Sequence, residues 1–263
     1  MSLEVLTKAD TTDLIELSEV KSRLGITAVT YDTVLGYIID DVSSAVNIYL
    51  GRELARQQYK ESLQGRGRQR IFLTAVPVDE DTVSVVEAGV TLTEATDFTF
   101  EDHDAGGIYK SGGWHDDFDE DVVATYYGGY LMPGVVATWA VNTARTAGDW
   151  VKPTSPSLSP RLMICTTAGT FHAVTEPTWP AAGSTVTDGT AVWTAHYAWE
   201  LPSDLKRLAF AAVKHQYETQ EMVGGLVEAR FEGLSERYSE STSVGLPSWI
   251  TTGLDRWRLG MAQ

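Results

Sequence analysis

Residues 122–130 read VVATYYGGY and begin the longest stretch of the chain without a charged residue, which runs to residue 144. A stretch of that length raises the question of a membrane span. Glycines at 128, 129 and 134 and a proline at 133 interrupt it, and Thr125 and Thr138 make it partly polar. Because glycine and proline favour turns over the interior of a long helix, the stretch predicts a strand, a turn and a second strand, and no membrane segment.

The residues before this stretch show helical and strand-like patterns in turn. Apolar residues repeat every three or four positions from Tyr31 to Tyr49, which predicts an amphipathic helix that ends at Gly51. A shorter helix is expected at Glu19–Leu24, capped by Ser18 and ended by Gly25. The strand-like runs that follow are Gln57–Leu63, Ile71–Thr74, Thr82–Glu87, Asp97–Phe100, Gly107–Lys110 and Val122–Tyr127.

Residues 135–199 differ from their flanks in composition. They hold three basic and three acidic residues, so the formal charge of −16 of the chain (20 Lys and Arg against 36 Asp and Glu) comes from the flanks. They also hold five of the eight tryptophans and many Thr, Ser, Gly and Pro residues. Short β-prone runs, such as Leu162–Cys165 and Ala191–Thr194, lie between turn signals, and there is no helical period. This segment predicts a small all-β module.

A third helix is expected after the module, because Pro202, Ser203 and Asp204 precede an apolar repeat that Gly224 interrupts. A strand is expected at Leu234–Ser239 and a terminal helix or arm at Pro247–Leu259. The segments before residue 135 and after residue 199 would join directly if the module were removed. The sequence therefore predicts an α+β protein: a discontinuous body (residues 1–134 and 200–263), with a helical bundle packed on a small antiparallel β-sheet, and an inserted all-β module (residues 135–199).

The order of these segments resembles that of the tailed-phage head–tail connector family, also called neck adaptor or head-completion proteins. The resemblance rests on the ordered set that begins EVKSRLGI at residues 19–26, continues through YYGGY at 126–130 and closes with LPSDLK at 201–206. It implies a virion protein of the neck, assembled in the host cytoplasm. Such subunits form a ring, commonly dodecameric, beneath the portal. The ring extends the DNA channel and docks the next neck or tail protein.

Two groups of residues are candidates for contacts in such a ring. The family uses its C-terminal segment to reach the portal, here residues 246–263, and tryptophan and arginine are favoured at interfaces. The candidates for a portal or subunit interface are Trp249, Leu254, Arg256, Trp257 and Arg258; packing on their own domain is the alternative. Arg66, Arg68 and Arg70 lie in a Gly-rich turn and are candidates for contact with DNA in the channel or with a partner, or form a plain hairpin tip.

The acidic charge fits passage of DNA better than its retention. A protein that grips duplex DNA neutralises phosphates with Lys and Arg, and this chain has an excess of carboxylates. Packaged DNA is therefore expected to pass through the ring without being held tightly. A solvated acidic surface on any protein gives the same composition, so the charge alone does not identify the function.

The inserted module has a resemblance of its own, to chitin-type carbohydrate-binding modules of phage structural proteins. Those modules stack sugar rings on exposed aromatics, and Trp150 and Trp179 are the candidates for a glycan or protein contact. Trp139 and Trp193 are expected in the core of the module. This chain has Ala144 and Arg145 where an aromatic commonly precedes the Gly-Asp pair. The alternative function is thus a carbohydrate-binding adhesion or decoration protein, with a glycan as partner.

The sequence does not favour an enzyme or a cofactor. It contains no GxSxG, HExxH or phosphate-binding loop. Cys165 lies in a β-prone run and is expected to be a buried small hydrophobe. No metal is expected, because the five histidines show no metal-ligand spacing; they are His103, His115, His172, His196 and His215.

Overall fold

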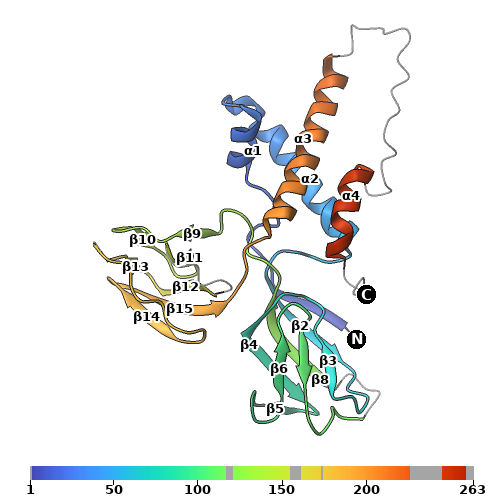
Figure 1. Ribbon diagram of the computed structural model, residues 1–263, viewed down its shortest axis with the longest axis vertical. Helices are drawn as coiled ribbons and strands as arrows, with labels where there is room; N and C mark the ends of the chain where they lie inside the picture. Colours follow the sequence, from blue (N-terminus) through green and yellow to red (C-terminus); the bar gives the residue numbers. More distant parts are fainter. Residues whose placement is uncertain (1, 117–120, 155–160, 173, 226–244, 259–263) are drawn as a thin grey trace. The chain divides into compact units, whose positions relative to one another are not determined.

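The computed structural model describes residues 2–116, 121–154, 161–172, 174–225 and 245–258 (Figure 1). By their contacts the residues group into two compact units, one of residues 1–10 and 55–200 and one of residues 11–54 and 201–263. The predicted strand at Leu234–Ser239 lies outside the described residues. No helix among the described residues is long and apolar enough to cross a membrane.

The second unit is helical. Its elements are α1 (Leu17–Leu24), the 3-10 turn η1 (Val29–Tyr31), α2 (Asp32–Leu50), α3 (Ser203–Gly225), α4 (Ser248–Leu254) and the 3-10 turn η2 (Asp255–Trp257). α3 packs against α2 and α4 (Figure 1). Gly25 and Gly51 end α1 and α2 with φ of 71° and 69°, left-handed values that glycine adopts without strain. The predicted cap at Ser18 is wrong: α1 begins at Leu17, and the N-cap position belongs to Glu16.

The apolar stripe predicted for the second helix forms the core of this unit. Its buried members face the buried apolar residues of α3 and α4. They are Leu35, Ile38, Ile39, Val42, Val46 and Leu50 on α2, Leu205, Leu208, Ala209, Ala212 and Val213 on α3, and Ile250 and Leu254 on α4. At roughly 1.5–3 kcal/mol for each fully buried large aliphatic side chain, this shared core explains why the described helices pack together.

The first unit contains the body sheet, an antiparallel sheet of five strands. Its order is β1-β2-β8-β4-β5, from β1 (Ser2–Thr7), β2 (Gln57–Leu63), β8 (Val122–Gly128), β4 (Val78–Glu87) and β5 (Val90–Leu92). Residues 122–128 of the stretch VVATYYGGY thus form the central strand, which pairs with both β2 and β4. A smaller sheet, β3-β7-β6, combines β3 (Arg70–Phe72), β7 (Gly107–Tyr109) and β6 (Thr99–Asp102).

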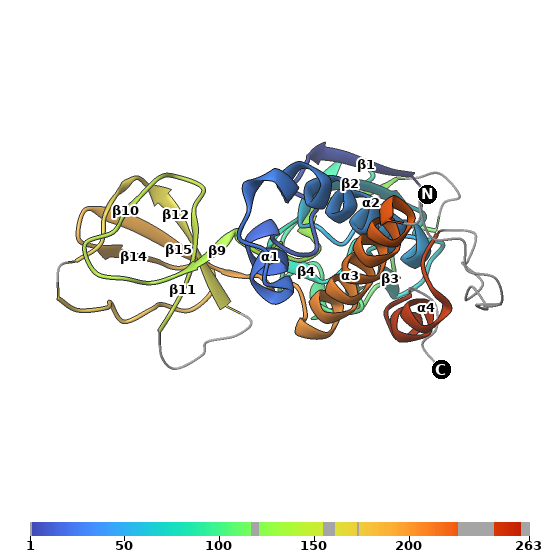
Figure 2. The same cartoon turned by 90° about the horizontal axis from the view of Figure 1, so that it is seen from above.

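The β module is a second five-stranded sheet with a short two-stranded ribbon. The sheet order is β14-β15-β12-β11-β9, from β14 (Thr185–Asp188), β15 (Ala191–Tyr197), β12 (Arg161–Thr167), β11 (Trp150–Lys152) and β9 (Val136–Thr138). β14, β15 and β12 run side by side (Figure 2). The ribbon pairs β10 (Ala144–Arg145) with β13 (Gly169–Thr170). Trp139 and Trp193 lie in the module core together with Cys165, as the sequence predicts.

The fold class α+β with an antiparallel body sheet is therefore confirmed, and strands outnumber helices in the described chain. The packing of a helical bundle on that sheet stays a prediction. The edge strand β1 is an addition that the sequence reading did not contain. The division into a discontinuous body and an inserted module stays a prediction, because the contacts group the module with the body sheet in the first unit.

Candidate functional site

A cluster of charged and aromatic side chains joins the body sheet to the β module within the first unit. Arg56 is its centre: Nη2 donates a hydrogen bond to Oδ2 of Asp79 over 2.7 Å. The guanidinium carbon lies 4.1 Å from the ring centre of Tyr127 and 4.9 Å from that of Trp150. Tyr127 belongs to β8 of the body sheet and Trp150 to β11 of the module. One buried cation therefore contacts both parts, with the favourable geometry of cation–π stacking.

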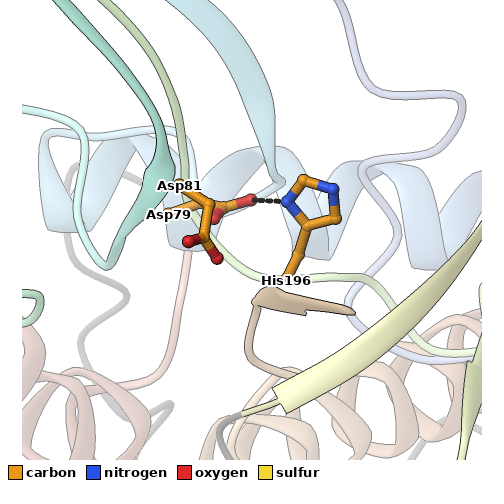
Figure 3. Close-up of side chains that lie close together, drawn as sticks. All are labelled: Asp79, Asp81 and His196. Atoms are coloured by element: carbon orange, nitrogen blue, oxygen red, sulfur yellow. Dashed lines mark ion pairs between the residues drawn. The ribbon is translucent and has the colours of Figure 1, made fainter. Parts of the chain in front are cut away.

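Asp79, Asp81 and His196 form the second part of the junction (Figure 3). His196 Nδ1 lies 3.4 Å from Oδ2 of Asp79. Asp81 accepts a hydrogen bond from the backbone N–H of Tyr197 over 3.3 Å. Burial raises the pKa of the Asp81 carboxyl, against the lowering effect of that hydrogen bond. Of the residues that the structure describes, these three are the group that could hold a metal ion.

His103 extends the junction along the same edge. Its Nδ1 lies 3.1 Å from the carbonyl oxygen of Val78, and its Nε2 lies 3.2 Å from Oε2 of Glu80. The centre of its ring lies 4.8 Å from the ring centre of Tyr197 and 5.2 Å from that of Trp199. Burial raises the pKa of the Glu80 carboxyl. Polar and aromatic contacts thus hold the last strand of the module to the start of β4.

The structure buries Trp150, one of the two candidates for a glycan or protein contact. Trp150 is 6% exposed and packs with Leu131, Leu162 and Ala198. It lies against the body sheet through Arg56, so its ring is used for docking and cannot stack on a sugar. Trp179 is half-buried: its ring packs edge-on against Trp193 at 6.4 Å, and its Nε1 donates to Glu176 over 2.7 Å.

The structure brings the three candidate arginines of the Gly-rich turn around one surface hollow. Arg66, Arg68 and Arg70 line a cavity of about 290 Å³. Arg70 is bidentate on Glu101, with Nε 2.7 Å from Oε2 and Nη2 3.0 Å from Oε1. That hydrogen bond raises the pKa of Arg70 and lowers the pKa of Glu101. Arg66 donates from Nε to the neutral side chain of Gln64 over 2.9 Å.

The C-terminal candidates have different environments. Leu254 is fully buried in the helical core, so its assignment to a portal or subunit interface is corrected. Arg256 pairs with Asp204 at the start of α3 and lies 5.3 Å from the ring centre of Trp257. Arg258 stacks 5.2 Å from the ring centre of Tyr49. Trp249 is 49% exposed and contacts the ring of His215 edge-on.

The sequence reading missed the junction residues Arg56, Asp79 and Asp81, and it named His196 only as a scattered histidine. The one local signal is the pair of carboxylates at residues 79 and 81, which extended backbone places on the same side. Nothing local links them to His196, because more than a hundred residues separate the two segments.

The fold is that of a two-unit α+β protein. Residues 13–134 match the family model of the head completion protein, so the chain is similar to head completion proteins over these residues and the predicted resemblance to that family is confirmed. The resemblance of the module to carbohydrate-binding modules stays a prediction. The matched range includes α1, α2, the body-sheet strands from β2 to β8, and three junction residues, Arg56, Asp79 and Asp81.

Solved structures give further matches, each over 98% of this chain and 95% of the other. They are chains in the neck of an empty gene transfer agent particle (15% identity, TM-score 0.44), in the virion of a native gene transfer agent particle (14%, 0.46) and in the neck of the native particle (14%, 0.44). No curated protein sequence matches the chain at the significance that we required.

Proposed function

We propose that the chain is a structural, non-enzymatic adaptor in the neck of a tailed-phage virion or a related particle. Copies assemble in the host cytoplasm into a ring, dodecameric as in the family, that docks beneath the portal, extends the DNA channel and receives the next neck or tail protein. The observation that carries this proposal is the match of residues 13–134 to the head completion protein family.

An exposed apolar stripe on α2 supports a ring of copies. Val34, Tyr37 and Ile48 are 44%, 67% and 67% exposed. At about 100° per residue they fall within one narrow face of the helix. Apolar side chains gathered on one helix face favour a partner surface. We expect a neighbouring copy to cover this stripe in the ring.

The hollow lined by Arg66, Arg68 and Arg70 supports a second contact, with carboxylates of the portal or of a neighbouring copy. Arg70 is already neutralised by Glu101, whereas the contact of Arg66 with Gln64 leaves its positive charge uncompensated by that partner. Arginine binds carboxylates in a bidentate, directional manner. In a chain of net charge −16, this patch offers a local complement to an acidic partner.

Co-assembly with the portal protein of the same particle tests the proposal. Native mass spectrometry and electron microscopy should show a closed ring of about twelve copies, the usual number for the family, stacked on the portal. Ile48→Asp should prevent the ring while leaving the helical content unchanged, since Ile48 is exposed in the isolated chain. Val90→Asp, at a valine on β5 that is 62% exposed, is the matched control. Persistent monomers that ignore the portal would overturn the proposal.

A further inference from the structure

The junction cluster has the composition of a metal site. One carboxylate oxygen from each of Asp79 and Asp81 and one ring nitrogen of His196 lie within 4.8 Å of one another. Figure 3 shows the three side chains pointing toward one another, with Asp79 and Asp81 on the body-sheet side and His196 on β15 of the module. Ligand atoms around a single transition-metal ion are about 3–4 Å apart, because each lies about 2.0–2.2 Å from the metal. A small rotation of these side chains would therefore meet that geometry.

The hydrogen bonding of the cluster points to a missing ligand. Asp79 is 2% exposed, and its Oδ1 has no hydrogen-bond partner among the described residues. Nδ1 of His196 likewise makes no hydrogen bond there, and its contact with Oδ2 of Asp79 is an ion pair at 3.4 Å. A buried acceptor without a partner is costly. Arg56 holds only Oδ2 of Asp79, so it fixes the orientation of the carboxylate and leaves the other oxygen for a further positive group.

We propose that Asp79, Asp81 and His196 bind a divalent transition-metal cation of the Zn²⁺ or Mn²⁺ class. Imidazole nitrogen suits Zn²⁺, and carboxylate oxygen is accepted by both ions. With His196 neutral, the net charge of Asp79, Asp81 and Arg56 together is −1. A divalent cation is therefore favoured electrostatically. Asp81 is exposed, and solvent can complete the coordination on its side.

The position of the cation gives it a structural role. Two ligands come from β4 of the body sheet, and the third comes from β15, the last strand of the module. A single bound ion would therefore cross-link the β module to the body sheet. This inference does not depend on the proposed neck function, because it concerns only contacts within the first unit.

Metal binding by the untagged full chain tests the proposal, with Zn²⁺ and then Mn²⁺ as the probes. After removal of metal by a chelator, isothermal titration should give one ion per chain, and saturation should raise Tm. Asp81→Asn and His196→Gln should each weaken the affinity by about 100-fold or more, since even the loss of a residue that only supports a ligand costs about 10–100-fold.

His115→Gln is the matched control, because His115 also pairs with a carboxylate, Asp121, with Nδ1 and Oδ2 2.6 Å apart. Circular dichroism of the chelated variants checks that they fold. The proposal is overturned if the wild-type chain binds no stoichiometric ion, or if the junction variants bind as well as the His115→Gln control. A cluster that is balanced by a protonated His196 instead of a metal would give the first of these results.

Discussion

Arg56 and Asp79 form a buried ion pair with 2.7 Å between Nη2 and Oδ2, and the same guanidinium is stacked against Tyr127 and Trp150. The side chains of Arg56 and Asp79 are 11% and 2% exposed. Replacing both partners of such a buried pair by apolar residues often costs little stability. Removing only one partner is costly, because it leaves an uncompensated charge in the interior.

Replacement of Arg56 by glutamine should therefore destabilise the first unit strongly. We expect a loss of about 3 kcal/mol in the free energy of unfolding, the lower end for breaking a buried pair. Arg56→Lys keeps the charge and loses the planar stacking, so its loss should be nearer about 1 kcal/mol. Urea unfolding followed by tryptophan fluorescence measures both. Equal losses for the two variants would show that the charge of Arg56 is not what matters.

The residues that the sequence predicted well are those whose environment is set locally. The apolar repeat places α2 within one residue at each end, and β2 has the bounds that the sequence predicts. The central strand β8 was also recognisable, because alternate residues are buried along it. In each case the periodicity of side chains along a single segment carries the information.

The features that the sequence did not reveal depend on contacts between distant segments. All six residues of β1 are exposed, so no alternation marks the strand, and it is defined by its pairing with β2. Trp150 and Trp139 look alike in sequence, but Trp150 is buried by docking on the body sheet and Trp139 by the module core. Asp79 on β4 and His196 on β15 are likewise brought together by the docking of the module on the body sheet, and no local pattern predicts the pair.

Tyr126 should be a strong stabilising residue of the body sheet. Its hydroxyl donates to Oε2 of Glu61 over 2.6 Å and accepts from the backbone N–H of Ala75 over 3.1 Å. Glu61 is fully buried, and burial together with Glu61 raises the pKa of the Tyr126 phenol. Tyr126→Phe should cost about 2 kcal/mol in the free energy of unfolding, as for a hydrogen bond to a charged group. Tyr127→Phe keeps the ring beneath Arg56 and is the control; an equal effect of the two would contradict the prediction.

Gly128 and Gly36 should respond in opposite ways to alanine. A Cβ at Gly128 would lie 2.1 Å from the carbonyl oxygen of Ala75, and one at Gly36 would meet no atom within 4 Å. Gly128→Ala should therefore cost about 3 kcal/mol through a forced backbone shift. Gly36→Ala, in the middle of α2, should stabilise the helical unit by roughly 0.5–1 kcal/mol. Denaturant unfolding measures both, and a neutral Gly128→Ala would mean that the backbone near Ala75 moves freely.

The contribution of Asp13 to stability should fall as the pH rises. A salt-bridged carboxylate, whose pKa is lowered, has the opposite pH dependence. Burial, the charge of Asp40 and a hydrogen bond with the Asp40 side chain raise the pKa of Asp13 above its ordinary value of 3.8. The folded chain therefore binds the proton more tightly than the unfolded chain does. That contribution to stability is fully present below pH 3.8 and is lost as the pH rises through the pKa of the folded state.

Asp13→Asn removes the repulsion with Asp40 and should raise Tm at pH 7. The gain over the wild-type chain should shrink as the pH falls from 7 toward 3.8, because Asp13 itself takes up a proton at its raised pKa within this range. Thermal unfolding at a series of pH values between these limits measures the difference. Asp10→Asn, at an exposed carboxylate of the same segment, is the matched control and should shift Tm little at either pH. A lower Tm for Asp13→Asn at pH 7 would show that the ionised Asp13 is stabilising, because a favourable partner would then outweigh its repulsion with Asp40.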